Sequence, residues 1–247
     1  MTETQTIKIE SKIKKYGISI EEMAKNGLAF GHKTSRLHPK MAPYVALVKD
    51  GVHVIDLNKT ADCLTTALEV IENLIKEGKS MILVGTKPHF KELVKSVAEE
   101  CGLCYVNERW IGGTFTNFPE IKKRIDYFKK LEEQTKSQDF SKYTKKEQLK
   151  ILKEVEKLRT KFEGIKKLEK LPDLVFVLDI KKDLLAVQEA KKKGVNVIAI
   201  VDTNVDPSLI DYPIPANDDA MSSVKYILDK IKDVIKNTKP EIKNEKQ

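Results

Sequence analysis

Three short and nearly continuous apolar runs constrain the fold of this chain more than any other feature of its sequence. They lie at residues 81–84 (MILV), 174–178 (LVFVL) and 195–201 (VNVIAIV). A strand in a parallel sheet is covered on both faces, so it is apolar throughout instead of alternating. The runs therefore predict a buried parallel sheet.

Helical patterns alternate with these runs. Apolar residues spaced by three or four predict helices at about 60–77, 88–101, 183–193 and 218–235, with further strands at 52–57 and 104–106. Such alternation is typical of a doubly wound α/β fold. We therefore predict a mainly parallel five-stranded sheet with helices on both faces, whose first strand is 52–57. We interpret 212–215 as an extended segment fixed by its prolines.

Between the third and fourth strands, the pattern changes to two long charged helices at about 117–133 and 144–168. Their narrow apolar stripes predict an inserted antiparallel coiled-coil hairpin. The second stripe consists of Leu152, Val155, Leu158, Phe162, Ile165 and Leu168. The predicted organisation is a basic N-terminus (1–17), an α/β sandwich domain (18–116 and 171–236), the hairpin (117–170) and a polar tail (237–247).

The positive charge of the chain lies on the predicted hairpin. Residues 122–170 hold 17 Lys/Arg and 9 Asp/Glu, whereas the rest of the chain holds 28 of each, so this segment carries the whole net charge of +8. A basic segment indicates a polyanionic partner, and nucleic acid is the commonest one. The alternative is a lysine-rich face that serves solubility alone.

Several classes of protein receive no support from the sequence. No apolar run approaches the roughly 20 residues that a membrane span needs, and residues 1–10 lack a signal-peptide pattern, so we expect a cytoplasmic protein without a membrane partner. The sequence contains neither of the glycine-rich nucleotide-binding motifs, G-x-G-x-x-G and G-x-x-x-x-G-K-[ST], so we expect no bound cofactor. Cys101 and Cys104 form a lone C-x-x-C, which we interpret as two reduced thiols.

Acidic residues follow the last predicted strands, and Asp202 and Asp206 are weak candidates for metal ligands. Carboxylates grouped at one sheet edge bind Mg²⁺ in some enzymes. Asp is also a common capping and turn residue, which is the interpretation that we favour. No nucleophile or base stands beside these acids, so we predict no catalytic residue. An enzyme that binds a phosphorylated small molecule at 85–87 and 202–206 stays open as the alternative function.

Two glycine-containing segments carry the candidate binding residues. The first, 30–41 (FGHKTSRLHPKM), reads as a basic loop that grips phosphates, with His32 ordering it; the alternative is an exposed loop without a role. The second, 105–118 (YVNERWIGGTFTNF), holds the only tryptophan and suits docking better than catalysis. We expect Trp110 to be buried at the base of the hairpin, with stacking on an RNA base as the alternative.

Five blocks together resemble the bacterial small-subunit ribosomal protein S2 family, over about residues 18–235. They occur in the family's order: FGHKTSRLHPKM, GVHVIDLNKT, YVNERWIGGTFTNF, LPDLVFVLD and VIAIVDTNVDPSLIDYPIPANDDA. The resemblance implies a non-enzymatic ribonucleoprotein component in translation. It implies a place between the head and body of the small subunit, contacts with rRNA and neighbouring proteins, and help in anchoring the mRNA-binding ribosomal protein S1. No homo-oligomer is expected.

The resemblance also guides the choice of site residues. We infer rRNA contacts for basic residues inside these blocks, Lys33, Arg36, Lys40 and Arg109, and for others outside them, Lys87, Lys122, Lys123 and Arg124. Residues of the family's motifs that we expect to shape the binding segments are Gly31, His32, Pro39, Trp110, Gly112, Gly113, Thr114 and Asn117.

Overall fold

The computed structural model describes residues 13–137, 140 and 142–238, and these fall into two compact units. Unit 1 contains the described parts of 1–80 and 197–247 together with 176–181, and unit 2 contains the described part of 81–175 together with 182–196. The predicted N-terminus and tail lie mostly outside the described residues. The division into a sandwich domain and a hairpin domain stays a prediction.

The larger sheet has five strands in the order β5-β4-β6-β7-β8 and is flanked by helices, which confirms the predicted α/β class. Its strands are β4 (Met81–Val84), β5 (Cys104–Val106), β6 (Leu174–Val177), β7 (Asn196–Val201) and β8 (Tyr212–Pro215). The neighbours β4 and β5 pair in parallel, as do β7 and β8. The apolar runs at 81–84, 174–178 and 195–201 thus supply three of the five strands.

One of the five strands predicted for this sheet was wrong. The segment 212–215 forms β8, in which Pro213 and Pro215 lie opposite Ala199 and Val201 of β7. Proline has no N–H for a ladder, but β8 is an edge strand and needs donors on one side only. The segment predicted as the first strand instead forms β3 (Val52–Ile55) in a separate sheet.

That separate sheet is antiparallel, with the order β1-β3-β2, and it belongs to unit 1. Its other strands are β1 (Phe30–Lys33) and β2 (Val45–Lys49). The predicted loop at 30–41 is therefore a strand followed by two short 3-10 helices, η1 (Thr34–Arg36) and η2 (Pro39–Tyr44). Phe30 and Leu47 both pair with Val54, which places the three side chains in one row across the sheet.

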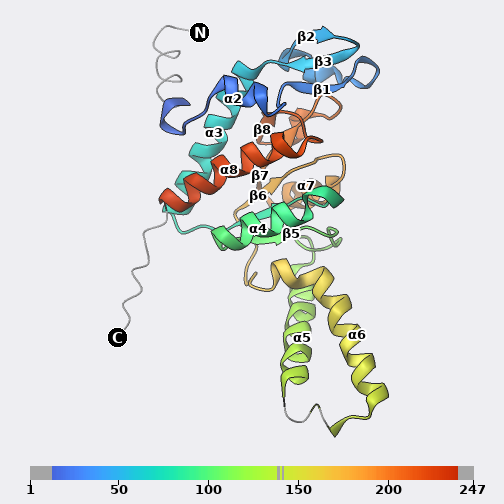
Figure 1. Ribbon diagram of the computed structural model, residues 1–247. Coiled ribbons are helices and arrows are strands. Elements are labelled where there is room, and N and C mark those ends of the chain that lie inside the picture. The colour runs from blue at the N-terminus through green and yellow to red at the C-terminus, as the bar shows by residue number, and fades with distance from the viewer. Residues whose placement is uncertain (1–12, 138–139, 141, 239–247) are drawn as a thin grey trace. The chain divides into compact units, whose positions relative to one another are not determined.

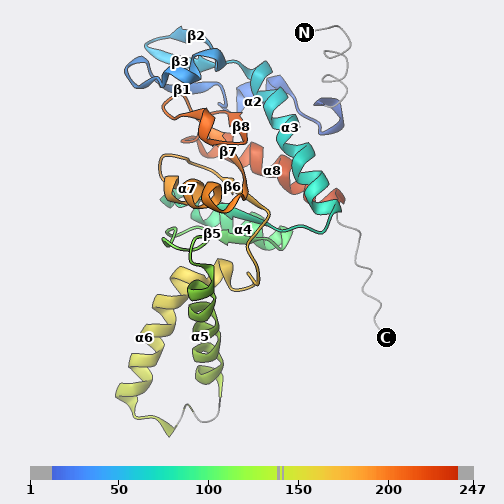
Figure 2. The ribbon, with the colours of Figure 1, turned by 180° about the vertical axis from the view of Figure 1, so that it is seen from behind.

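Helices α2 (Ile20–Lys25), α3 (Leu57–Lys76) and α8 (Met221–Thr238) belong to unit 1, where α3 packs against α8 and β8 (Figure 1, and from behind in Figure 2). Ser19 caps α2, and its hydroxyl accepts a hydrogen bond from the Glu22 N–H. Unit 2 contains α4 (Lys91–Cys101) and α7 (Leu184–Lys193). Within the described ranges, no helix has the length and apolarity needed to cross a membrane.

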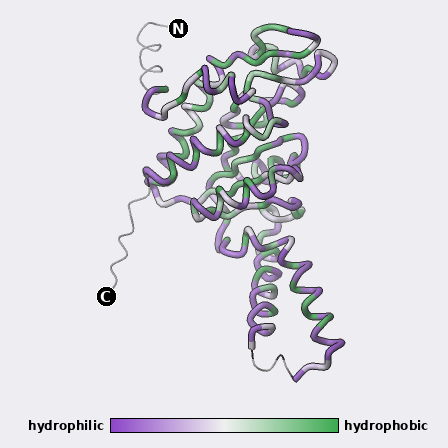
Figure 3. Tube along the Cα trace, viewed as in Figure 1, coloured by the Kyte–Doolittle hydropathy of each residue, from purple (hydrophilic) through white to green (hydrophobic). Residues whose placement is uncertain are grey.

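Unit 2 also contains the predicted hairpin, formed by α5 (Phe118–Lys136) and α6 (Lys145–Phe162), followed by the 3-10 helix η5 (Glu163–Ile165). Figure 3 shows hydrophilic and hydrophobic residues alternating along both helices. Phe128 of α5 and Val155 of α6 are buried, but Leu152 is 46% exposed, so the predicted apolar stripe of α6 is shorter than expected. The helix begins with a capping box at Thr144 and Glu147.

Candidate nucleic-acid interface

In unit 1, the predicted basic residues surround a shallow hollow of about 330 Å³ beside the small sheet. Lys33 ends β1 and Arg36 lies in η1, and both side chains are exposed. Neither residue forms an ion pair within the described parts of the chain. The hollow is lined by Gly31, His32, Lys33, Arg36, Val52, Asp202, Asn217 and Asp219.

Gly31 is required by the close approach of β1 to the segment after β7. A Cβ atom added at Gly31 would lie 2.6 Å from Thr203 Cγ2, 2.9 Å from Thr203 Oγ1 and 3.2 Å from the His53 carbonyl oxygen. The same threonine hydroxyl accepts a hydrogen bond from the His32 N–H at 2.9 Å. The glycine thus allows β1 to reach the acidic segment beyond β7.

The imidazole of His32 is held between two carboxylates. Its Nδ1 lies 3.1 Å from Asp202 Oδ2, and its Nε2 lies 3.5 Å from Asp219 Oδ2. The hydrogen bond to Asp202 raises the pKa of His32, burial opposes this, and the charges of Asp202, Asp218 and Asp219 add to the rise. His32 therefore links β1 to the acidic segment after β7 through its imidazole, and its role in ordering the basic segment stays a prediction.

The amide of Asn204 completes this network. Its Nδ2 lies 3.0 Å from His32 Nε2, whereas its buried Oδ1 has no hydrogen-bond partner in the described structure. Which of Asn204 Nδ2 and His32 Nε2 is the donor in this contact depends on the tautomer of His32.

The His32 network predicts a dependence of stability on pH. Because the folded-state pKa lies above the ordinary value of 6.5, the stabilisation is complete below about pH 6.5 and is lost as pH rises through the folded-state pKa. We expect the stability difference between the wild type and His32→Gln to shrink between pH 6 and 9, measured by urea unfolding. Asp202→Asn should lower the NMR-measured pKa of His32. An unchanged pKa in that variant would contradict the assignment.

Lys40, a predicted rRNA contact, and Asp206, a weak candidate for a metal ligand, form an ion pair with each other. Lys40 Nζ lies 2.8 Å from Asp206 Oδ2 and 2.7 Å from Ser208 Oγ. The Lys40 ammonium lowers the pKa of Asp206, whose other oxygen caps η6 (Pro207–Leu209) through the Ser208 N–H. Asp206 is thus a capping residue, as favoured, and the described residues contain no group of three or more candidate metal ligands.

In unit 2, the predicted motif residues form the turn between β5 and α5. Trp110 is only 5% exposed and packs edge-on against Phe115, with ring centroids 4.9 Å apart, so the expectation of a buried tryptophan is confirmed. Thr114 is buried and donates a hydrogen bond to the Ile111 carbonyl. Gly113 adopts a left-handed conformation with φ +92°. The turn offers no exposed aromatic ring for stacking.

Glu189 of α7 holds this turn, and sequence reasoning missed it. The carboxylate accepts hydrogen bonds from the N–H groups of Gly113 at 2.6 Å, Phe115 at 2.9 Å and Thr116 at 3.2 Å. Glu189 is 4% exposed, so this is a buried anion held by backbone donors. The one signal was an acid on the apolar face of α7, beside Ala186 and Ala190.

The remaining predicted cations of unit 2 have different surroundings. Lys87 precedes η3 (Pro88–Phe90), and its ammonium lies 5.9 Å from the Phe90 ring centroid. Arg109 is exposed and lines a hollow of about 240 Å³ together with Arg159. On α5, Lys122 donates to the Glu169 carbonyl, Lys123 pairs with Glu120 at 2.6 Å, and Arg124 is exposed. Of the predicted cations of unit 2, Arg109 and Arg124 are therefore the most available.

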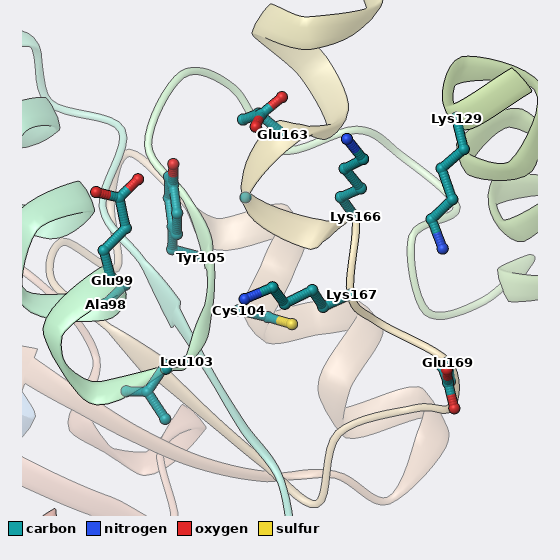
Figure 4. A pocket seen from close by; sticks show the side chains of 12 residues that line it. Ala98, Glu99, Leu103, Cys104, Tyr105, Lys129, Glu163, Lys166, Lys167 and Glu169 are labelled. Atoms are coloured by element: carbon teal, nitrogen blue, oxygen red, sulfur yellow. The ribbon is translucent and has the colours of Figure 1, made fainter. Parts of the chain in front are cut away.

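A larger hollow of about 570 Å³ lies where the hairpin meets β5 (Figure 4). Lys129 of α5 and Lys166 and Lys167 after η5 line it, but so do Glu99, Glu163 and Glu169, so its charge is balanced. Burial raises the pKa of the Cys104 thiol in its wall. Like Cys63 and Cys101, Cys104 forms no disulfide in this structure.

Gly164 lies at the contact between η5 and β5, and it was not identified from the sequence. A Cβ atom added at Gly164 would lie 2.1 Å from the carbonyl oxygen of Tyr105 and 2.7 Å from its Cδ2. Glycine therefore allows η5 to pack directly on the backbone of β5. This contact fixes the returning end of the hairpin to the edge of the larger sheet.

Comparison with known proteins confirms the resemblance predicted from the five blocks. The family described as Ribosomal protein S2 matches residues 23–238. A relative from Dictyoglomus thermophilum, named small ribosomal subunit protein uS2, is 46% identical over 218 residues, which cover 88% of this chain and 89% of the relative. Relatives with the same name from Dehalococcoides mccartyi (strain ATCC BAA-2266 / KCTC 15142 / 195) and Roseiflexus sp. (strain RS-1) are 42% and 44% identical. They align over 88% and 87% of this chain and over 89% and 82% of their own lengths.

Proposed function

The chain belongs to the ribosomal protein S2 family, and from that premise we propose that it binds rRNA in the small ribosomal subunit. The family consists of structural ribosomal proteins, so the chain is a structural component of the ribosome and not an enzyme. The alternative of an enzyme acting on a phosphorylated small molecule is set aside on this ground. The position between head and body, in the cytoplasmic particle, is part of the proposal.

The distribution of charge is the observation that carries rRNA binding. The whole excess of +8 lies within 122–170, and Lys33, Arg36 and Arg109 add exposed cationic side chains outside this segment, in both units. Lysine and arginine neutralise phosphates and release counterions, which gives a salt-dependent affinity that is largely independent of base sequence. Lys40 contributes less, because Asp206 already neutralises it.

The test is the double variant Arg36→Ala plus Arg109→Ala. If both guanidinium groups contact phosphates, the salt dependence of rRNA binding should weaken by about one unit of log–log slope per residue, with roughly a tenfold loss of affinity at moderate salt. Filter binding of the full chain to protein-free small-subunit rRNA measures both quantities. The control removes the same charge from exposed residues of α7, as Lys192→Ala plus Lys193→Ala. Equal effects in both variants would count against the predicted site.

The anchoring of ribosomal protein S1 rests on the family resemblance, and we assign it to the outer face of the small sheet. Phe30 is 56% exposed and Leu47 is 54% exposed, in one row with Val54. Exposed apolar side chains of this kind suit a protein partner better than phosphates. In reconstituted subunits, Phe30→Ser plus Leu47→Ser should reduce the content of S1 and leave rRNA binding intact. Unchanged S1 content would overturn this assignment.

A further inference from the structure

We infer that the outer face of α6 is a further RNA-binding surface, which binds a phosphate backbone along a line of lysines; the inference rests on the proposed function. Successive members of this line are four, three, four and four residues apart. At 3.6 residues per turn, that spacing keeps them on one narrow face of the helix. The α6 lysine stripe consists of Lys146, Lys150, Lys153, Lys157 and Lys161.

The charges of the stripe are not neutralised within the described chain. All five side chains are exposed, and none takes part in a hydrogen bond or ion pair with another described residue. The acids of α6 already have other partners. Glu147 completes the capping box, Glu154 accepts a hydrogen bond from the Tyr127 hydroxyl at 3.0 Å, and Glu156 pairs with Arg159 at 3.0 Å. The stripe therefore presents five uncompensated positive charges.

The stripe also faces away from α5. Val155 and Phe162 are buried on the side of α6 that packs within unit 2. At about 100° per residue, these two positions lie on the opposite side of the helix from Lys150, Lys153 and Lys157. The hairpin thus holds its apolar contacts on one side of α6 and its cations on the other.

The geometry of the stripe points to an extended polyanion. From Lys146 to Lys161 the helix rises roughly 22 Å, with about one ammonium group every 4–6 Å. A compact anion would contact only one or two of these groups, whereas a nucleic-acid strand offers a phosphate to each in turn. Ammonium groups act as point charges and do not read base edges. The partner that fits is the backbone of an rRNA strand, bound without regard to sequence.

The test replaces the five stripe lysines with glutamine in the full chain. Lys and Gln have similar helix propensities, so α6 should be retained, which circular dichroism verifies. Binding to protein-free small-subunit rRNA is measured across salt concentrations. If each lysine neutralises one phosphate, the log–log salt slope should fall by roughly 3.5–4.5 units. The matched control replaces five exposed lysines outside the stripe: Lys25, Lys181, Lys192, Lys193 and Lys225.

The outcomes separate this inference from the proposed function. A large loss of slope in the stripe variant and a small one in the control supports the α6 surface. Equal losses in the two variants would mean that only total charge matters, and would overturn it. Normal rRNA binding by the stripe variant would also overturn it. If subunits reconstituted with that variant bind rRNA normally but lose a neighbouring acidic protein, the stripe binds that protein and not RNA. Failure of the wild-type chain to bind rRNA would instead overturn the proposed function.

Discussion

Replacing Gly164 with alanine is expected to lower the free energy of unfolding by about 3 kcal/mol or more. The new methyl group would meet the backbone carbonyl of Tyr105 at 2.1 Å, and a backbone carbonyl within a paired strand cannot move aside as a flexible side chain can. We expect η5 to lift from β5, so that the returning end of the hairpin loses its fixed position. Urea unfolding of the full chain measures the effect.

The control for this variant is Gly112→Ala in the same unit. The nearest atom to a Cβ atom at Gly112 is Leu185 Cδ2 at 3.6 Å, an ordinary van der Waals distance. Neither glycine has a positive φ, so the two substitutions differ mainly in the space around the new methyl group. The Gly112 variant should remain within about 0.5 kcal/mol of the wild type. Similar losses at the two sites would show that close packing at Gly164 is not the cause.

Replacing Glu189 with alanine is expected to cost roughly 3–5 kcal/mol, because three backbone N–H groups lose their acceptor together. The groups belong to Gly113, Phe115 and Thr116, and two of the hydrogen bonds are 2.6 and 2.9 Å long. Glu189→Gln keeps the shape but turns one oxygen into a donor, so we expect it to recover only part of the stability. The fluorescence of Trp110 reports this turn directly, because it is the only tryptophan and it packs on Phe115.

The control is the neighbouring exposed residue of the same helix, as Gln188→Ala. An exposed position without a buried partner should change stability by about 0.5 kcal/mol at most. If Glu189→Ala unfolds at the same urea concentration as this control, the carboxylate does not hold the turn.

The features that the sequence predicted correctly are those that local pattern determines. Buried strands such as β4 are apolar at every position, and the helices of the hairpin show a regular spacing of apolar residues. Such signals do not depend on where distant segments meet.

The features that were missed depend on contacts between distant segments. Gly164 meets Tyr105 from 59 positions away in the sequence, and Glu189 lies 76 positions from Gly113, so no local pattern marks either residue. The strand β8 was missed for a different reason, because Pro213 and Pro215 argue against a strand unless its edge position is known. The ion pair of Lys40 with Asp206 likewise joins residues that are 166 positions apart.

The prolines of β8 have a consequence for the chain before it is assembled into a particle. The Ala216 N–H bonds the Val201 carbonyl of β7, so alternation along the strand would point the N–H groups of residues 213 and 215 outward. Both positions are proline and have no N–H, and the Pro215 carbonyl is already bonded by the Thr60 hydroxyl at 2.6 Å. An edge without donors cannot template the strand of another molecule. Newly made chains are thereby protected from aggregating through this edge before they are assembled into the small subunit.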